Sequence, residues 1–308
     1  MTAFALPERR AGRILTAMTK TQTHTLAAPG ADVVYDVRGP LPPAAGLPPL
    51  LMIGQPMTAE GFTALAGHFT DRTVVTYDPR GLGRSVRRDG RSDHTPQQQA
   101  ADLHLLIEEL GAGPVDLFAS SGGAVTALEL VAAHPGDVRT LVAHEPPINA
   151  ALPDAVGADR ARAAFHEAYQ ARGFGAGMAA FIAMTSWTGE FTDAYFAQPA
   201  PDPAAYGMPA DDDGKRDDPL LSKSSWAVTD YRPDVAALTA APTRIVIAVG
   251  EESAQLYTGR AALGVAALLG QEATVFPSHH GGFLGGQFGY AGKPEEFAAK
   301  LREVLDAA

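Results

Sequence analysis

The chain has 308 residues, of which 46% are hydrophobic and 19% charged, and its formal net charge is −11. This length accommodates one large domain or a domain with an inserted segment, and the composition is ordinary for a globular protein. The acidic balance argues against nucleic acid or an anionic membrane as the main partner. The chain contains no cysteine, which excludes disulfides, thiol catalysis and cysteine-based zinc sites.

Residues 1–20 are expected to form a disordered extension of the folded part. They lack the apolar segment of a signal peptide, and Met18 is a second candidate for the translation start. No apolar run in the sequence approaches the roughly 20 residues that a membrane-spanning helix requires. We therefore expect a cytoplasmic protein that has neither a membrane nor a nucleic acid as its partner.

The first half of the chain alternates between predicted strands and predicted helices. Strand patterns occur at 23–26, 32–38, 50–53, 73–77, 115–119 and 138–144, and helical spacing occurs at 60–69, 97–111 and 122–135. From residue 50 onward the strands are apolar along their length. Such strands, when they alternate with helices, indicate a parallel sheet that is covered on both faces.

The alternation stops at residues 150–232, where three helical stretches (158–173, 177–187 and 191–198) and an acidic loop (201–219) replace it. It resumes with strands at 243–249 and 272–277 and with helices at 256–270 and 294–305. These patterns predict an α/β core made of residues 21–149 and 233–308. A helical cap, or lid, at 150–232 interrupts this core.

The segment FASSGGAV at 118–125 is the principal candidate for a catalytic motif. It joins a strand to a helix, which is the context of a nucleophile elbow, a sharp turn that lifts one side chain above the sheet. The residues two places before and after the nucleophile must be small. Ser121 has alanine and glycine there, whereas Ser120 would have Phe118 on one side. Ser121 is therefore the predicted nucleophile; the alternative is a glycine-rich turn with solvated serines.

Four features in chain order resemble the α/β-hydrolase family, and the resemblance covers nearly the whole chain from about residue 21. IGQPM (53–57) stands where the family has its oxyanion loop, and DPRGLGRS (78–85) looks like the family's D-x-R-G-x-G-x-S turn. ASSGG (119–123) is similar to the elbow, and SHHGGF (278–283) follows the last strand, where the family places its histidine. The resemblance implies a mostly parallel eight-stranded sheet, with helices on both faces and a helical cap.

The resemblance and the chemistry of acyl transfer together suggest roles for particular residues. A serine nucleophile needs a base, for which His280 is the candidate and His279 the alternative. The oxyanion of a tetrahedral intermediate needs two preorganised N–H donors, and the backbone groups of Gln55 and Gly122 are the candidates.

The acidic residue that would orient the histidine has two candidates. The family usually draws it from the loop after the seventh strand, but the usual position here is Ser253, and Glu252 lies one residue earlier. Its other placement in the family is the end of the sixth strand, where this chain has Glu145. We favour Glu145 over Glu252, since a carboxylate at that strand end can still orient the histidine. Otherwise each would be a solvent-facing carboxylate.

The leading functional hypothesis is a serine hydrolase that cleaves a carboxylic ester, lactone or thioester of a mainly apolar small molecule through an acyl-enzyme. The alternatives are a non-hydrolytic member of the same fold (a cofactor-free oxygenase, a C–C lyase or an acyltransferase) and a ligand-binding receptor. We expect no cofactor and no metal site. The expected partner is a small-molecule substrate, and a homodimer is compatible with the sequence. Candidate substrate contacts are Met57, Ser120, Met184, Trp187, Phe191 and Trp226.

Overall fold

A mixed β-sheet forms the centre of the computed structural model, which describes residues 21–43 and 46–307. The expected extension at 1–20, including Met18, lies outside the described residues. The strands follow the order β1-β2-β4-β3-β6-β7-β8-β9, and β5 pairs with β2. The pairs β1–β2, β2–β4 and β2–β5 are antiparallel, and every pair from β4 across to β9 is parallel.

The strands are β1 (Thr21–Ala28), β2 (Ala31–Arg38), β3 (Leu50–Gln55), β4 (Val74–Tyr77), β5 (Val86–Arg87), β6 (Val115–Ser121), β7 (Val138–His144), β8 (Arg244–Gly250) and β9 (Thr274–Phe276). The α-helices are α1 (Thr63–Gly67), α2 (Pro96–Leu110), α3 (Gly122–Ala133), α4 (Ala155–Thr185), α5 (Asp193–Phe196), α6 (Trp226–Thr229), α7 (Val235–Ala240), α8 (Tyr257–Leu268) and α9 (Pro294–Asp306). Short 3₁₀ helices are η1 (Ala59–Phe62), η2 (Asn149–Ala151), η3 (Pro203–Tyr206), η4 (Lys223–Ser225) and η5 (Gln287–Gly289).

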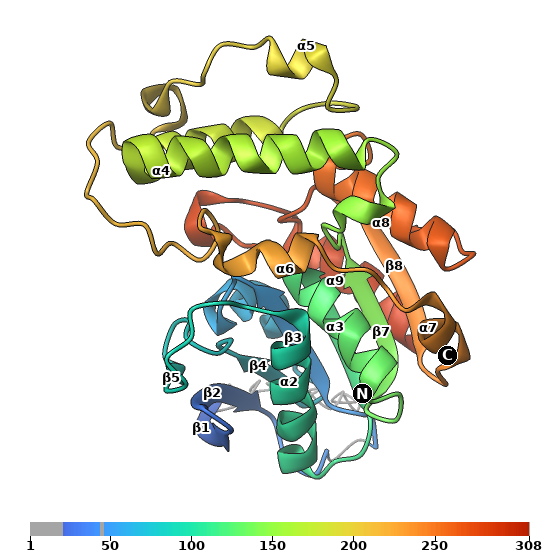
Figure 1. Cartoon of the computed structure of the whole chain (residues 1–308). Coiled ribbons are helices and arrows are strands. Elements are labelled where there is room, and N and C mark those ends of the chain that lie inside the picture. Colours follow the sequence, from blue (N-terminus) through green and yellow to red (C-terminus); the bar gives the residue numbers. More distant parts are fainter. Residues whose placement is uncertain (1–20, 44–45, 308) are drawn as a thin grey trace, which may run out of the picture.

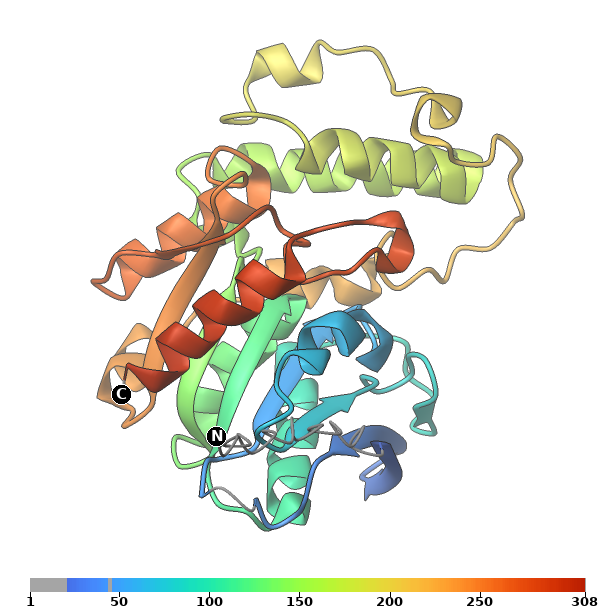
Figure 2. The same cartoon turned by 180° about the vertical axis from the view of Figure 1, so that it is seen from behind.

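Helices cover both faces of the sheet. Successive side chains of a strand point to opposite faces, so each strand contributes side chains to both interfaces. In β3, Leu51 and Ile53 belong to a buried cluster with residues of α2, α3 and α8, whereas Leu50 and Met52 belong to a second cluster with residues of α1 and α9. Figure 1 shows α2 and α3 in front of the sheet, and the reverse view in Figure 2 shows α9 on the other face. The sheet therefore has two apolar interfaces, as its continuous apolar strands predict.

All eight strands expected from the sequence are present, and the α/β-hydrolase fold class is confirmed. The structure adds the two-residue strand β5, the four-residue helix α6 and the six-residue helix α7, all too short to give a periodic pattern. The helices expected at 158–173 and 177–187 are one element, α4, which is interrupted at Gly173 (φ 83°, ψ −170°). Glycine suits this break because it readily adopts a positive φ, and a Cβ there would lie 2.3 Å from Asp212 Oδ1.

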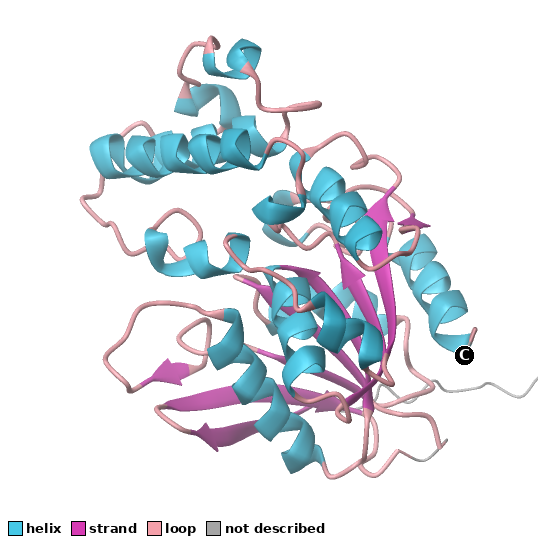
Figure 3. Cartoon of the chain, turned by 45° about the vertical axis from the view of Figure 1, so that its right-hand side comes forward, coloured by secondary structure: helices cyan, strands magenta, loops and turns pink. Residues whose placement is uncertain are grey.

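The segment 150–232, called here the helical insertion, contains helices and loops but no strand among its residues, all of which are described. Figure 3 shows the long helix of the insertion, α4, at the top of the molecule, apart from the strands of the sheet. Polar contacts join the insertion to α8. Arg260 pairs with Asp154 and donates to the carbonyl of Gly189 (2.6 Å), while Gly189 N–H donates to Gln255 O (2.9 Å). These contacts attach this end of the insertion to α8 and to the loop before it, while Val228 and Tyr231 at its other end pack in the core cluster.

Over residues 21–43 and 46–307, none of the helices combines the length and the apolar character needed to cross a bilayer.

Substitution of Phe297 by alanine tests the interface between the sheet and α9. Phe297 is fully buried and packs against Phe118, Phe276 and Phe283. We expect Phe297→Ala to lower the free energy of unfolding by about 3–5 kcal/mol, because it removes apolar contacts and leaves a cavity. Urea unfolding followed by circular dichroism measures the change. Phe288→Ala, at a side chain that is 57% exposed, is the matched control and should change it by less than about 0.5 kcal/mol. Equal effects of the two changes would contradict this packing.

Candidate active site

The residues of the candidate site stand at the carboxyl ends of five parallel strands. Gln55 ends β3, Ser121 ends β6 and Gly250 ends β8. Glu145 directly follows β7, and His280 lies in the loop after β9. The carboxyl ends of neighbouring parallel strands meet at one edge of the sheet, so residues far apart in the sequence are brought together there.

Ser121 occupies a strained turn between β6 and α3. Its backbone has φ 58° and ψ −130°, a conformation that costs a residue with a side chain about 1–3 kcal/mol and is common at functional sites. The turn lies close to β3, because a Cβ on Gly123 would lie 2.7 Å from Gly54 Cα. Ser120 is different: it is buried, and its Oγ lies 3.3 Å from Nδ1 of His144. Of the two serines, only Ser121 has the backbone of an elbow.

Gln55 and Gly122 lie beside Ser121. Gln55 is the register partner of Ser121 in the parallel pairing of β3 with β6, and a Cβ on Gly122 would lie 2.9 Å from Gln55 O. Gly122 is the first residue of α3, where unpaired N–H groups and the helix dipole favour negative charge. The side chain of Gln55 is buried, and neither its oxygen nor its nitrogen has a hydrogen-bond partner within the described chain. Such a group is costly to bury without a ligand.

The DPRGLGRS turn supports the loop that follows β3. Asp78 is buried; its Oδ1 accepts from the Ala59 N–H (2.9 Å), and its Oδ2 accepts from Nε of Arg84 (2.7 Å). Burial would raise the pKa of Asp78, but hydrogen bonds from Arg84 and Ala59 and the charge of Arg84 outweigh burial and lower it. Arg80 is also buried and pairs with Asp102 of α2. The polar residues of this turn therefore hold loops in place.

The carboxylate of Glu145 is fully buried and has hydrogen-bond partners on both oxygens. Oε2 lies 2.6 Å from His280 Nδ1 and accepts from Thr258 Oγ1 (2.5 Å), while Oε1 accepts from the Gly250 N–H (2.9 Å). An ionised carboxylate can only accept, so Nδ1 of His280 carries the proton in this contact. The other ring nitrogen of His280 is then free to accept a proton.

The same surroundings keep Glu145 ionised. Burial alone would raise its pKa, but the charge and hydrogen bond of His280, followed by the contributions of His144 and Thr258, outweigh burial and hold the pKa well below its usual range. Glu145 has a positive φ of 49°, which is uncommon for a residue with a side chain. The backbone is thus held in an unfavourable conformation at the point where the carboxylate meets the histidine.

The neighbouring histidines have different surroundings. Nδ1 of His279 accepts from the Gly281 N–H (3.0 Å) within its own loop, and Nε2 lies 3.4 Å from Ala291 O. His144 is fully buried, 5.9 Å from His280 between ring centroids, and burial is the main cause that lowers its pKa to about 4. His144 is therefore neutral at pH 7, and of these histidines only His280 meets the Glu145 carboxylate at hydrogen-bond distance. No hydrogen bond joins His280 to Ser121 in the described structure, a common situation in the absence of substrate.

Glu252 does not share this environment. Its side chain is 51% exposed and lies 3.9 Å from Nζ of Lys293. Ser253, at the position where the acid was expected by resemblance, is buried, and its hydroxyl has no hydrogen-bond partner among the described residues. Of the two candidate acids, the structure brings Glu145 to His280.

Sequence reasoning missed two residues that hold Glu145. Thr258 lies in the first turn of α8, where a threonine carries no recognisable motif. Gly250 ends β8, and a Cβ there would lie 2.6 Å from Ser278 O and 3.1 Å from Glu145 Oε1. Only the absence of a side chain lets the carboxylate and the histidine loop approach this backbone.

The candidate substrate contacts are dispersed. Met184 and Phe191 are buried in the core of the insertion, in a cluster that includes Tyr257 and Ala261 of α8. Trp187 donates its indole N–H to Glu190 O (3.0 Å) in the same region. These three side chains are explained by packing and a hydrogen bond within the insertion.

The other candidates lie nearer the sheet. Ser120 is buried against His144. Met57 is partly buried beside Gly54 and Gly61, in the loop after β3. Trp226 begins α6, and the Arg162 guanidinium of α4 lies 4.3 Å from its ring centroid.

Comparison with known proteins identifies a family and a fold. The model of the alpha/beta hydrolase family matches residues 25–300. An uncharacterized hydrolase of Bacillus subtilis (strain 168), YraK, is 37% identical over 123 residues, which are 40% of this chain and 44% of the relative. The chain thus matches less than half the length of that curated relative.

Solved structures share the fold over almost the whole chain. VinJ is 19% identical with a TM-score of 0.63, and a thermophilic esterase from Thermogutta terrifontis is 22% identical with a TM-score of 0.60. Each alignment covers 93% of this chain and 98% of the other. At these identities the likeness concerns the fold alone.

The low pKa of Glu145 predicts a pH-dependent contribution to stability. A carboxyl whose pKa is lower in the folded than in the unfolded state stabilises the fold above its unfolded pKa, about 4.3, and this contribution is lost as the pH falls through the folded value. We expect the difference in unfolding free energy between wild type and Glu145→Gln to shrink as the pH falls below about 4.3, where the unfolded chain takes up the proton and the folded chain does not. Urea unfolding at pH values on both sides of this point measures it. Glu252→Gln is the control, and a similar pH dependence in that variant would argue against the prediction.

Proposed function

The chain belongs to the α/β hydrolase family, and we propose that it is a serine hydrolase that cleaves a carboxylic ester, lactone or thioester of a mainly apolar small molecule. The observation that supports this proposal most directly is the contact of His280 with the buried, ionised carboxylate of Glu145. Ser121 stands in the same row of strand ends with the backbone of a nucleophile elbow. These features match the needs of a serine nucleophile, its base and the residue that orients the base.

In the proposed first step, the Oγ of Ser121 attacks the carbonyl carbon of the substrate, and its proton passes to Nε2 of His280. The carbonyl oxygen becomes an oxyanion, which accepts hydrogen bonds from the backbone N–H groups of Gln55 and Gly122. The position of Gln55 beside Ser121 in the β3–β6 pairing supports this assignment. Glu145 stabilises the imidazolium that forms and keeps Nδ1 of His280 as a donor.

In the second step, the carbonyl re-forms and the bond to the leaving group breaks, while His280 returns its proton to the leaving oxygen or sulfur. The acyl group then remains on Ser121 as an ester. A water molecule gives its proton to His280 and attacks this ester, and a second tetrahedral intermediate collapses to the free acid and the regenerated Ser121 hydroxyl. No cofactor enters either step.

We propose further that the helical insertion acts as a lid over the site. The orientation of the fold supports this, because α4 and α5 lie beyond the upper ends of β7 and β8 in Figure 1. Met178, Phe181 and Ile182 of α4 are only partly buried, so apolar surface remains on the insertion for a substrate body. We assign the side-chain amide of Gln55 to a hydrogen bond with a polar substrate atom near the scissile carbonyl, since this amide has no hydrogen-bond partner in the described chain.

Labelling with a fluorophosphonate tests whether Ser121 is an activated nucleophile. We expect intact mass spectrometry to detect one adduct on the wild-type protein and none on Ser121→Ala, because the reagent reacts with a serine that a base activates. Ser120→Ala is the matched control and should still form the adduct, since Ser120 is buried. A folded wild-type protein that takes no label would make a binding function or non-covalent catalysis the better explanation. A labelled protein that hydrolyses no ester would indicate a non-hydrolytic chemistry on the same residues.

Paired substitutions of the two glutamates test the acid. With p-nitrophenyl esters as substrates, Glu145→Gln should lower kcat by about 10²–10⁴-fold, because His280 loses the carboxylate that orients it and stabilises its charged form. Glu252→Gln should leave kcat within about threefold, since that carboxylate is exposed and faces Lys293. The reverse pattern would assign the acid to Glu252.

A further inference from the structure

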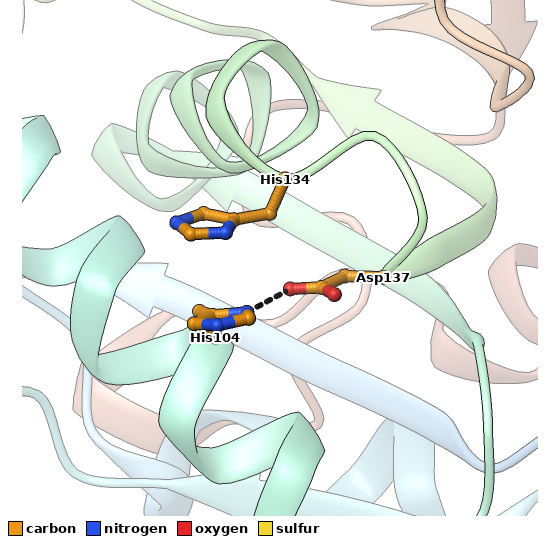
Figure 4. A group of neighbouring side chains, drawn as sticks. All are labelled: His104, His134 and Asp137. Carbon is orange, nitrogen blue, oxygen red and sulfur yellow. Dashed lines mark hydrogen bonds and ion pairs between the residues drawn. The ribbon is translucent and has the colours of Figure 1, made fainter.

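Three potential metal ligands gather on the side of the core that carries α2 and α3. They are His104 of α2, His134 at the C-terminal cap of α3, and Asp137 in the turn before β7. One potential ligand atom from each residue lies within 4.8 Å of the others. Figure 4 shows the two imidazole rings one above the other, with the carboxylate beside them. No metal site was expected from the sequence, since His104 lies on a different helix, 30 residues before His134.

A hydrogen-bonded turn holds two of the three residues in place. The N–H of Asp137 donates to His134 O (3.1 Å), which closes a four-residue turn with Pro135 and Gly136 at its centre. The N–H of His134 in turn donates to Leu130 O (2.7 Å) of α3. The backbone of two ligand residues is therefore fixed before any ion arrives, which reduces the entropy that binding would cost.

The third residue already lies against the other two. His104 Nδ1 is 2.7 Å from Asp137 Oδ2, and the His104 and His134 rings stack with centroids 3.8 Å apart and planes 13° apart. Tetrahedral Zn²⁺ with bonds of about 2 Å separates its ligand atoms by about 3.3 Å. In the present, nearly parallel stack the lone pairs of the two rings do not converge, so one imidazole must turn about its χ angles for both to bind one ion, which would also replace the proton on His104.

The surroundings favour a cation. Besides Asp137, the carboxylate of Glu108 lies 3.6 Å from His104 Nε2, and the C-terminal end of α3 carries a partial negative charge. Arg139, a cation close in the sequence, is paired with Asp116 instead. The side chains of His104 and Asp137 are 27% and 16% exposed, so water and an ion can reach them.

We propose that His104, His134 and Asp137 bind Zn²⁺, or another first-row divalent ion with the same preference for imidazole and carboxylate ligands, with water completing the coordination. Ser121 and His134 stand at opposite ends of the 12-residue helix α3, about 18 Å apart along its axis. The ion would therefore take no part in the proposed hydrolysis. It would join α2 to the turn between α3 and β7.

Titration of the full chain, free of any histidine tag and dialysed against a chelator, with Co²⁺ tests this proposal. Co²⁺ bound in a four- or five-coordinate protein site gives visible d–d absorption bands much stronger than those of the free aqueous ion, and Zn²⁺ should abolish these strong bands as it displaces the cobalt. We expect one ion per chain, and a rise in Tm of about 5 °C with Zn²⁺ at roughly a hundred times its Kd.

Three variants separate this site from other histidines. His134→Ala and Asp137→Asn should each abolish the cobalt bands and the rise in Tm, and either variant alone is decisive if the other does not fold. His68→Ala, at an exposed histidine outside the cluster, should retain both. The proposal is overturned if wild type gives no bands with Co²⁺ on the order of 1 mM, or if the bands survive in a folded His134→Ala or Asp137→Asn protein.

Discussion

The buried carboxylate of Glu145 is the constraint on which the arrangement of the candidate site depends. A charge removed from water is stable only when charges and hydrogen bonds compensate it. Here the compensation comes from three separate parts of the chain: Gly250 at the end of β8, Thr258 in α8 and His280 after β9. Each partner must therefore be in position for the others to be stable, and the carboxylate joins segments that the sheet alone would not align.

The sheet fixes the other half of the site. Gln55 pairs with Ser121 between β3 and β6, and Ser120 pairs with His144 between β6 and β7. These register pairs therefore fix the position of the proposed oxyanion donors relative to β7, the strand that precedes Glu145. Close approach of the backbones at Gly122 and Gly123 makes this spacing tight. The elbow and the acid are consequently placed by hydrogen-bonded strands, and only the histidine depends on a loop.

The central strands and the helices on both faces of the sheet could be predicted because short apolar runs that alternate with helices are typical of buried parallel strands. The choice between Ser120 and Ser121 was also accessible, since it rests on the size of Phe118, which packs in the core below the elbow. The sequence also favoured Glu145 over Glu252, but only through the family resemblance. Both are carboxylates at strand ends, and what separates them is a backbone φ of 49° and a set of tertiary hydrogen bonds.

Other features could not be predicted from the sequence for the same reason, which is that they depend on tertiary contacts. Thr258 has an ordinary place in a helix and matters only because α8 packs beside β8 and its first turn reaches Glu145. His104 lies on α2, and its neighbours His134 and Asp137 follow α3, so only the packing of the two helices brings them together. Conversely, Met184 and Phe191 are apolar, as residues that line a pocket for an apolar substrate would be, but they lie in the core of the insertion. Apolar side chains in a helical segment indicate burial without saying what buries them.

Helix α8 contacts both the candidate site and the helical insertion. Thr258 in its first turn holds the Glu145 carboxylate, and Arg260, two residues later, holds Asp154 and Gly189 of the insertion. A displacement of the insertion at this end would therefore also move the helical turn that donates a hydrogen bond to Glu145. Mechanical coupling of this kind would make the geometry of Glu145 sensitive to the position of the insertion, without a separate signalling element.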